Sequence, residues 1–340
     1  MINGALRSTR PSRPTDAVAA RHYFLWLIPL FCVQILLVVS VRADPSRTMA
    51  LTIDDLPYQS SGYEDSIERV RYVTEGFINT LNKHNAPAIG FVNEANLAIT
   101  GEAALRKQLL TKWASAGVVL GNHTYSHADL NTVTVEEYKR QIKDGERVTL
   151  EIMSSQGSYQ RYFRHPYTHT GNTEAKKTSI NAYLAELGYE IAPYTIASQD
   201  SLFNRVYLDA LSAGDSELAE TLRIAFLDFV LRTTTFAEGK SEELFGAGIP
   251  QTLILHANRI TADTLSDLLT RLQARGYSFI DLSTAMKHPA YKTDDTLVTR
   301  YGPSWLWRWN KSLGAGISFR GDPEPPAWIV TRYEQSVKTE

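Results

Sequence analysis

The sequence predicts an α/β fold, a (β/α) barrel of about seven parallel strands with a helical insertion. Three observations support this prediction. Short β-like runs alternate with longer amphipathic stretches along residues 49–282. About seven such runs fit into about 240 residues, which favours a barrel over an open sheet. One stretch, residues 201–248, has helical periodicity and contains no strand-like run.

Each expected strand is a short apolar run, and each expected helix has an apolar period of about 3.6 residues. The expected strands are residues 49–53, 88–92, 118–121, 162–164, 189–196, 252–256 and 277–282. The expected helices are residues 64–84, 102–116, 135–154, 173–187 and 262–275. This alternation implies parallel strands joined by helical crossovers. We expect the insertion at residues 201–248 to overhang the functional site.

The N-terminus has the composition of an export segment. Four arginines precede an apolar run at residues 23–41, and residues 41–43 (VRA) resemble a signal-peptide cleavage site. The run is also just long enough to span a bilayer, so residues 1–43 are either a signal peptide or an N-terminal membrane anchor. Both alternatives place residues 44–340 outside the cytoplasm, in the periplasm or the extracellular space, free or anchored to the inner membrane.

Composition limits the kinds of site that the chain can form. The formal net charge is −2, with no long basic run outside the N-terminus, so we expect no nucleic-acid partner. The single cysteine, Cys32, lies inside the N-terminal apolar run. An exported domain without cysteine has neither disulfides nor thiolate ligands, so a metal site must use His, Asp or Glu. Nothing in the sequence indicates an oligomeric state.

Polar side chains suited to metal binding directly follow three of the expected strands. Asp54 and Asp55 follow the first strand, His123 and His127 follow the third, and His256 ends the run at residues 252–256. In parallel α/β folds the loops at the carboxyl ends of the strands converge into one site. We therefore expect these three segments to meet.

His123 and His127 are four residues apart and face the same way if the segment makes one helical turn. A carboxylate from another strand would complete three protein ligands and leave positions open for water and substrate, as in catalytic metal sites. Asp54 and Asp55 point different ways at a strand end, so one can bind metal while the other accepts a proton.

A second histidine pair, His165 and His169, has the same four-residue spacing. Pro166 directs His165 towards an extended conformation and interrupts the turn that would bring the two rings together. We therefore interpret this second pair as incidental to metal binding.

In order along the chain, these residues resemble the motifs of the polysaccharide deacetylase family of carbohydrate esterases. The matching segments are residues 52–57 (TIDDLP), 123–127 (HTYSH), 164–167 (RHPY) and 253–256 (LILH). The resemblance spans about residues 48–285. It implies a distorted (β/α) barrel that removes acetyl groups from amino sugars with one divalent metal ion, commonly zinc.

The resemblance also implies roles for five of these residues. Asp55, His123 and His127 would hold the metal ion. Asp54 would be the general base that acts on the attacking water, and His256 would be the general acid that protonates the leaving amine.

Two residues of the third motif would assist this chemistry. Arg164 would lie near Asp54 and keep it ionised through its positive charge. The backbone N–H of Tyr167 would stabilise the oxyanion together with the metal, a role that needs no particular side chain.

The sequence departs from the family pattern in the fourth motif, which normally has two aspartates before a Trp. Residues 196–204 (IASQDSLFN) contain one aspartate, Asp200, and no Trp. Asp200 is either the counterpart of the second aspartate, with Ala197 in place of the first, or the counterpart of the first, with Phe203 and Asn204 in place of the rest. Both alternatives leave open which residue supports Arg164 and which residues form the apolar wall around the acetyl methyl group.

A second departure concerns the first motif and the shape of the site. Leu56 stands where the family has Gly, and we expect its side chain to project into the cleft.

The chain beyond the N-terminal segment is expected to have two parts. Residues 44–300 would form the catalytic domain and residues 301–340 a C-terminal extension. Residues 301–309 (YGPSWLWRW) contain three tryptophans, which we expect to pack in the core or at its edge, the alternative being stacking on a sugar ring.

Three functional hypotheses follow. The favoured one is a metal-dependent deacetylase, of N- or O-acetyl groups, that acts on a glycan of the cell envelope or extracellular matrix. The second is an amidohydrolase of the same family that acts on a small amide. The third is a catalytically silent glycan-binding module, which would be expected to have lost Asp54 or His256, whereas this chain retains both.

Overall fold

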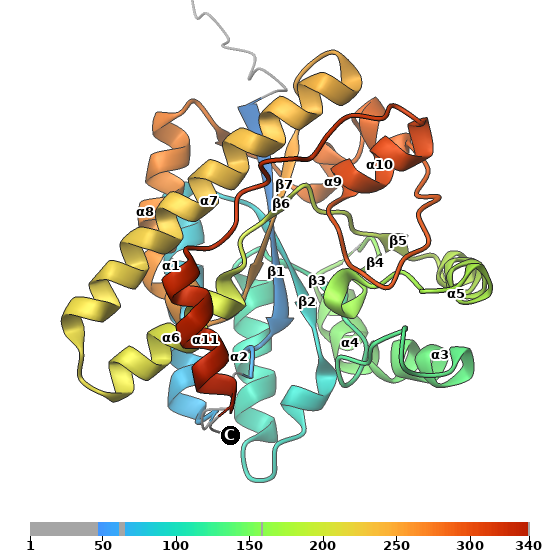
Figure 1. Ribbon diagram of the computed structural model, residues 1–340. Helices are drawn as coiled ribbons and strands as arrows, with labels where there is room; N and C mark the ends of the chain where they lie inside the picture. Colours follow the sequence, from blue (N-terminus) through green and yellow to red (C-terminus); the bar gives the residue numbers. More distant parts are fainter. Residues whose placement is uncertain (1–46, 61–64, 158, 339–340) are drawn as a thin grey trace, which may run out of the picture. The chain divides into compact units, whose positions relative to one another are not determined.

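The computed structural model describes residues 47–60, 65–157 and 159–338 and confirms the predicted fold class. A parallel sheet forms the centre of this region, and helices surround it (Figure 1). The strands are β1 (Thr48–Leu56), β2 (Ala88–Val92), β3 (Val119–Asn122), β4 (Tyr162–Phe163), β5 (Glu190–Ile191), β6 (Ile196–Ala197), β7 (Gln251–His256) and β8 (Ser278–Phe279).

The order of the strands leaves the barrel open on one side. The sheet runs β5-β4-β3-β2-β1-β7-β6, and β8 pairs with the first two residues of β1. In the described part of the chain no ladder joins β5 to β6, although they are successive strands. The intervening Pro193 has no N–H to donate to a ladder. The single strand expected at residues 189–196 is therefore wrong, and two short strands replace it.

The central strand, β1, is buried along all nine of its residues. It pairs with β2 and β8 on one side and with β7 on the other. Met49, Leu51 and Ile53 form part of the apolar core and are at most 1% exposed. Most residues of this strand are apolar because strands of parallel sheets are covered on both faces. Burial does not explain why two carboxylates lie near the end of the strand.

The helices between the strands are α1 (Ile67–His84), α2 (Ala103–Ser115), α3 (Val135–Asp144), α4 (Arg147–Ser155), α5 (Glu174–Glu186), α8 (Arg259–Ala274) and the short α9 (Leu282–Ala285). Helices α1 and α2 pack through Phe77 and Trp113, whose ring centroids are 5.3 Å apart. The prediction of a single helix at residues 135–154 is wrong, because the helical conformation is interrupted at Gly145, between α3 and α4. Gly145 also has a role in the functional site, which lies at the carboxyl edge of the sheet.

The segment expected as an insertion consists of α6 (Asp200–Ser212) and α7 (Ser216–Phe245). Because it connects β6 to its neighbour β7, it is the crossover connection between these two strands. Helix α7 packs against β6 and α8 (Figure 1). Its residues Leu222, Phe226 and Val230 are fully buried. The expectation that the whole segment overhangs the site is wrong, since α7 belongs to the wall of the barrel.

The C-terminal extension contains α10 (Trp305–Leu313) and α11 (Ala327–Lys338). Trp305 and Trp309 are buried, which confirms core packing for two of the three tryptophans, whereas Trp307 is 45% exposed. The signal peptide or anchor predicted at residues 1–43 lies outside the described residues. Within the described ranges no helix has both the length and the apolar character needed to span a bilayer.

Candidate active site

The residues predicted to form the site meet at the carboxyl ends of the strands. The register of the sheet pairs Asp54 of β1 with His256 of β7. On the other side of β1, the last residue of β3 is Asn122, which immediately precedes His123. Segments far apart in the sequence therefore converge, as expected for the carboxyl ends of parallel strands.

Asp55, His123 and His127 form a cluster of potential metal ligands. Asp55 Oδ1 lies 3.4 Å from His123 Nε2 and 3.5 Å from His127 Nε2. One ligand atom from each residue lies within 4.8 Å of the other two. Tetrahedral ligands about 2.1 Å from an ion stand about 3.4 Å apart, so this spacing fits one ion. Asp55 Oδ1 is also buried without a hydrogen-bond partner, as expected of a metal-binding oxygen.

The two histidines reach this cluster from an irregular loop, not from the helical turn expected. Thr124 and His127 have left-handed backbone conformations, with φ of 61° and 57°. The Thr124 side chain accepts a hydrogen bond from the Ala128 N–H at 3.0 Å. Gly145 lies against the loop, where a Cβ would approach the backbone of Thr124 and Tyr125 to within 2.7 Å. Glycine at residue 145 therefore allows the loop to pack against α3 and α4.

The end of β1 also differs from the expectation. Asp55, not Leu56, adopts a positive φ, of 66°. Leu56 is fully buried, with its side chain over Gly90 of β2. The expectation that Leu56 projects into the cleft is wrong, because the neighbouring glycine leaves an apolar space that its side chain fills.

Burial and nearby charges give the cluster the protonation that a metal ion needs. Burial lowers the pKa of His123 to about 3 and also lowers the pKa of His127. Burial would raise the pKa of Asp55, but the histidine charges, that of His127 first, hold it below its ordinary value. His123 Nδ1 lies 2.7 Å from the carbonyl O of Arg164, which can only accept, so Nδ1 carries the proton. Its Nε2 lone pair is then available to a cation.

Asp54 lies buried beside the cluster and is 2% exposed. Its Oδ2 is 3.9 Å from His123 Nε2, and its Oδ1 has no hydrogen-bond partner among the described residues. Burial raises the pKa of Asp54 to about 6, although the charges of Arg164 and His256 oppose this rise. A carboxylate with a pKa near neutrality can both accept and release a proton at physiological pH.

Arg164 is fully buried, but its hydrogen bonds go to Thr52 of β1 and to the carbonyl O of Pro193, and not to Asp54. Its Nη2 donates to Thr52 Oγ1 at 2.9 Å, and its guanidinium lies 5.0 Å from the centre of the Phe91 ring. Its Nε and Nη1 have no partner in the described structure. Arg164 thus influences Asp54 through its charge, which lowers the pKa of that carboxyl group, and makes no direct ion pair with it.

His256 and Asp200 form a hydrogen-bonded pair. His256 Nδ1 lies 2.7 Å from Asp200 Oδ1, and the backbone N–H of His256 donates to Asp200 Oδ2 at 2.7 Å. Thr261 Oγ1 donates to the same Oδ2 at 2.8 Å. Burial would lower the pKa of His256, but the charge and hydrogen bond of Asp200 outweigh it and raise the pKa to about 10. His256 is therefore held in the protonated form that a general acid needs.

This pairing shows what Asp200, the single aspartate of the fourth-motif segment, contacts. Asp200 contacts His256 and provides no support for Arg164. Phe203 is buried in the core with Phe226, with ring centroids 5.5 Å apart. Asn204 is also fully buried. Phe203 and Asn204 therefore belong to the interior of the barrel wall.

Sequence reasoning missed Gln59, which connects three parts of the site. Its Nε2 donates to Asp55 Oδ2 at 3.0 Å and to Ser201 Oγ at 2.7 Å. Its Oε1 accepts from Asn258 Nδ2 at 3.0 Å. The sequence offers only one signal for these residues, namely that Gln59 lies close to Asp55 and Asn258 lies close to His256. Polar residues near a motif are common, so this proximity does not identify a site residue.

Tyr167 stands at the edge of the site and is 58% exposed. Its ring lies edge-on to His127, with centroids 4.5 Å apart. The backbone is left-handed at Tyr167 and again at Thr168, with φ of 56° and 52°. Such conformations are uncommon for residues with a Cβ and depend on support from the surrounding structure.

The second histidine pair is separated, as expected. His165 is buried, stacks on Tyr138 and shares a hydrogen bond with its hydroxyl group at 2.9 Å. His169 is bound instead to Asp129, with Nδ1 2.9 Å from Oδ1. Neither ring belongs to the metal-ligand cluster.

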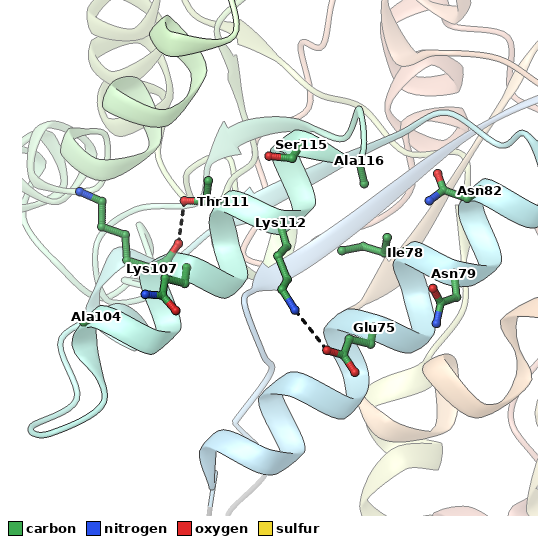
Figure 2. A pocket seen from close by; sticks show the side chains of 11 residues that line it. Glu75, Ile78, Asn79, Asn82, Ala104, Lys107, Thr111, Lys112, Ser115 and Ala116 are labelled. Atoms are coloured by element: carbon green, nitrogen blue, oxygen red, sulfur yellow. Dashed lines mark hydrogen bonds and ion pairs between the residues drawn. The ribbon is translucent and has the colours of Figure 1, made fainter.

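A groove of about 880 Å³ between α1 and α2 contains none of the predicted site residues (Figure 2). Lys112 Nζ and Glu75 Oε1 form an ion pair across it at 3.2 Å. Both side chains are about half exposed, and such pairs contribute little to stability. The lining has one carboxylate and no histidine, so it lacks the ligands for a catalytic metal.

Comparisons with known proteins agree with the motifs. Residues 42–192 match the family model described as polysaccharide deacetylase. A peptidoglycan-N-acetylglucosamine deacetylase of Bacillus cereus is 29% identical over 161 residues, which are 46% of this chain and 50% of that protein. A chitin deacetylase of Colletotrichum lindemuthianum is 27% identical over 165 residues, 48% of this chain and 57% of that protein.

A solved structure of a polysaccharide deacetylase from Bacillus cereus aligns with a TM-score of 0.49 at 20% identity, covering 69% of this chain and 91% of that one. The chain spans 35% to 57% of the length of the first three curated relatives. The family match contains the first three motifs in order, together with all three residues of the metal-ligand cluster. Residues 42–192 are thus similar to the polysaccharide deacetylase family, as are the curated relatives that the chain matches over about half of its length.

Proposed function

We propose that this protein is a metal-dependent hydrolase that removes acetyl groups from an acetylated amino-sugar glycan of the cell envelope or extracellular matrix. One observation carries the proposal. The Asp55–His123–His127 cluster is accompanied by a buried carboxylate, Asp54, and by an imidazole, His256, which Asp200 holds protonated. Relatives named as chitin and peptidoglycan deacetylases support a glycan substrate.

The ligand set fits a zinc ion. Two neutral imidazole nitrogens and one carboxylate oxygen are a usual donor set of catalytic zinc and leave positions open. Asp55 Oδ1 and the Nε2 atoms of His123 and His127 would hold the ion. Once bound, the ion would polarise the acetyl carbonyl and lower the pKa of a water molecule.

Asp54 and His256 would carry the proton transfers. Asp54 Oδ1, which has no partner, would take a proton from the attacking water as its oxygen adds to the acetyl carbon. When the bond from that carbon to the sugar nitrogen breaks, His256 Nε2 would give its proton to the nitrogen. The products are acetate and a free amine. Each of these general acid–base contributions is typically worth about 10² to 10⁴ in rate.

Tyr167 and Arg164 would complete the site. The backbone N–H of Tyr167 would donate to the oxyanion of the tetrahedral intermediate. The charge of Arg164 would limit the rise in the pKa of Asp54 that burial causes, so that Asp54 is ionised at neutral pH.

We place the enzyme outside the cytoplasm, in the periplasm or the extracellular space. The export-like composition of residues 1–43 supports this location, whether the segment is cleaved or remains as an anchor. Relatives whose names include chitin and peptidoglycan are consistent with it.

A substrate panel tests the proposal. Acetate release is measured from acetylated chitooligosaccharides, peptidoglycan, acetylated xylan and small N-acetyl amides, before and after chelation and after zinc is restored. We expect release from an amino-sugar glycan that is lost on chelation and recovered with zinc. Glycan binding without metal-dependent release would instead identify a silent binding module. Release from small amides alone would identify an amidohydrolase.

A further inference from the structure

We propose that the C-terminal extension positions Tyr167, and that Gly302 and Arg308 are the positioning residues. This proposal rests on the proposed function, in which the backbone N–H of Tyr167 binds the oxyanion. It adds to the active site a part of the chain that lies well outside the matched family segment, residues 42–192.

The loop that carries Tyr167 is held in an unfavourable backbone conformation. Tyr167 and Thr168 are successive left-handed residues, with φ of 56° and 52°. This region is disfavoured for any residue with a Cβ, and most of all for a β-branched residue such as Thr168. Two such residues in succession persist only where outside contacts hold them. The extension supplies these contacts.

Arg308 of α10 is fully buried beneath this loop. Its Nη2 donates to the carbonyl O of Thr168 at 2.8 Å, and its Nη1 donates to Thr170 Oγ1 at 2.8 Å. Asp295 Oδ2 lies 3.0 Å from Nη1 and only 2.6 Å from Lys177 Nζ, so one carboxylate forms ion pairs with both buried cations. The planar guanidinium thus holds two points of the loop at fixed positions.

Gly302 holds the same loop from a second direction. Its carbonyl O accepts from Thr168 Oγ1 at 2.8 Å and from the Tyr194 hydroxyl at 2.6 Å. A Cβ at residue 302 would overlap the carbonyl O of Tyr167 and Thr168 Oγ1. Only glycine therefore allows the extension to approach the loop this closely.

Apart from the edge contact between the Tyr167 ring and His127, the metal-ligand cluster has supports of its own. His123 is held by the carbonyl O of Arg164, and Asp55 by Gln59. The loop between the two histidines is held by Gln141, whose carbonyl O accepts from the Tyr125 N–H at 2.9 Å. Loosening the contacts of the extension should therefore misplace Tyr167 while the metal site stays intact.

The test uses three variants of the full chain: Gly302→Ala, Arg308→Lys and the isosteric Thr168→Val. The matched control is Trp307→Ala, which alters an exposed side chain on the same helix. We expect each variant to lower kcat by about tenfold to a hundredfold with KM changed by less than about twofold, since the contact serves the transition state. Zinc content should equal that of the wild type, and Trp307→Ala should leave kcat unchanged.

Amide hydrogen exchange followed by mass spectrometry gives a readout that does not need activity. Exchange in residues 165–170 should become faster in the three variants, while exchange in residues 121–128 should not change. If the wild type releases no acetate, the proposed function fails and this measurement still decides the positioning role. Unchanged exchange, or wild-type kcat in all three variants, overturns the proposal. Loss of zinc in parallel with kcat also overturns it, because the extension would then support the whole site.

Discussion

The chain contains two histidine pairs with the same spacing and different surroundings. The Nε2 atoms of His123 and His127 both lie within 3.5 Å of a buried carboxylate oxygen, that of Asp55. His165 is bound to the Tyr138 hydroxyl in the interior, and its other ring nitrogen has no partner.

The difference lies in the charges that face the first pair and His165, since His169 has a carboxylate partner of its own, Asp129. Asp54 and Asp55 give the first pair a negative environment that favours a cation. Burial, followed by the charges of Arg308 and Lys177, holds the pKa of His165 well below its ordinary value. Those two cations would also repel a metal ion. A four-residue spacing is thus compatible with both outcomes, and the neighbouring charges distinguish them.

The largest expected contrast is between His127→Ala and His169→Ala. The first removes one of the three cluster ligands, so zinc content should fall from about one ion per chain to near zero, and activity should be lost. The second removes a ring outside the cluster and should leave zinc bound. Elemental analysis of the purified variants measures this directly. Equal zinc content in the two variants would refute the assignment of the cluster.

Asp54→Asn separates metal binding from proton transfer. The amide is nearly isosteric but cannot take a proton from water, so kcat should fall by about 10² to 10⁴. Zinc content should stay at the wild-type level, because Asp55 and the two histidines are unchanged. Normal turnover in this variant would show that another group is the base.

Asp200→Asn should shift the pH dependence of activity. The negative charge of Asp200 raises the pKa of His256 to about 10, and a neutral amide removes this effect. His256 acts in its protonated form, so activity is lost as pH rises through its pKa. The alkaline limb of the kcat profile should therefore move to lower pH, and the acidic limb should move less. A profile that superposes on that of the wild type would exclude His256 as the acid.

Tyr138→Phe should have the smallest effect, and only on stability. It removes the hydroxyl group that shares a hydrogen bond with the buried His165 Nδ1. We expect the free energy of unfolding to fall by about 1 kcal/mol, with zinc content and kcat unchanged. Urea denaturation measures the change. A loss of zinc in this variant would show that the second histidine pair contributes to the metal site after all.

Several parts of the site could be predicted because they depend on local pattern. Asp54, His123 and His256 each follow an apolar run, and parallel strands bring such positions to one edge of the sheet. The conformations there could not be predicted. Thr124 and His127 are both left-handed, and the Thr124 end of their loop packs against Gly145, a contact that the sequence of the loop does not encode.

By itself, the sequence determined the barrel and the set of residues gathered at its carboxyl edge, because alternating apolar runs specify strands and crossovers. The tertiary structure alone decided that Asp200 serves His256 and that Gln59 binds Asp55. It also decided that Arg308 holds the loop after Tyr167. The contacts of Asp200 and Arg308 join segments on different elements, and all three contacts depend on side-chain directions that neither periodicity nor spacing encodes.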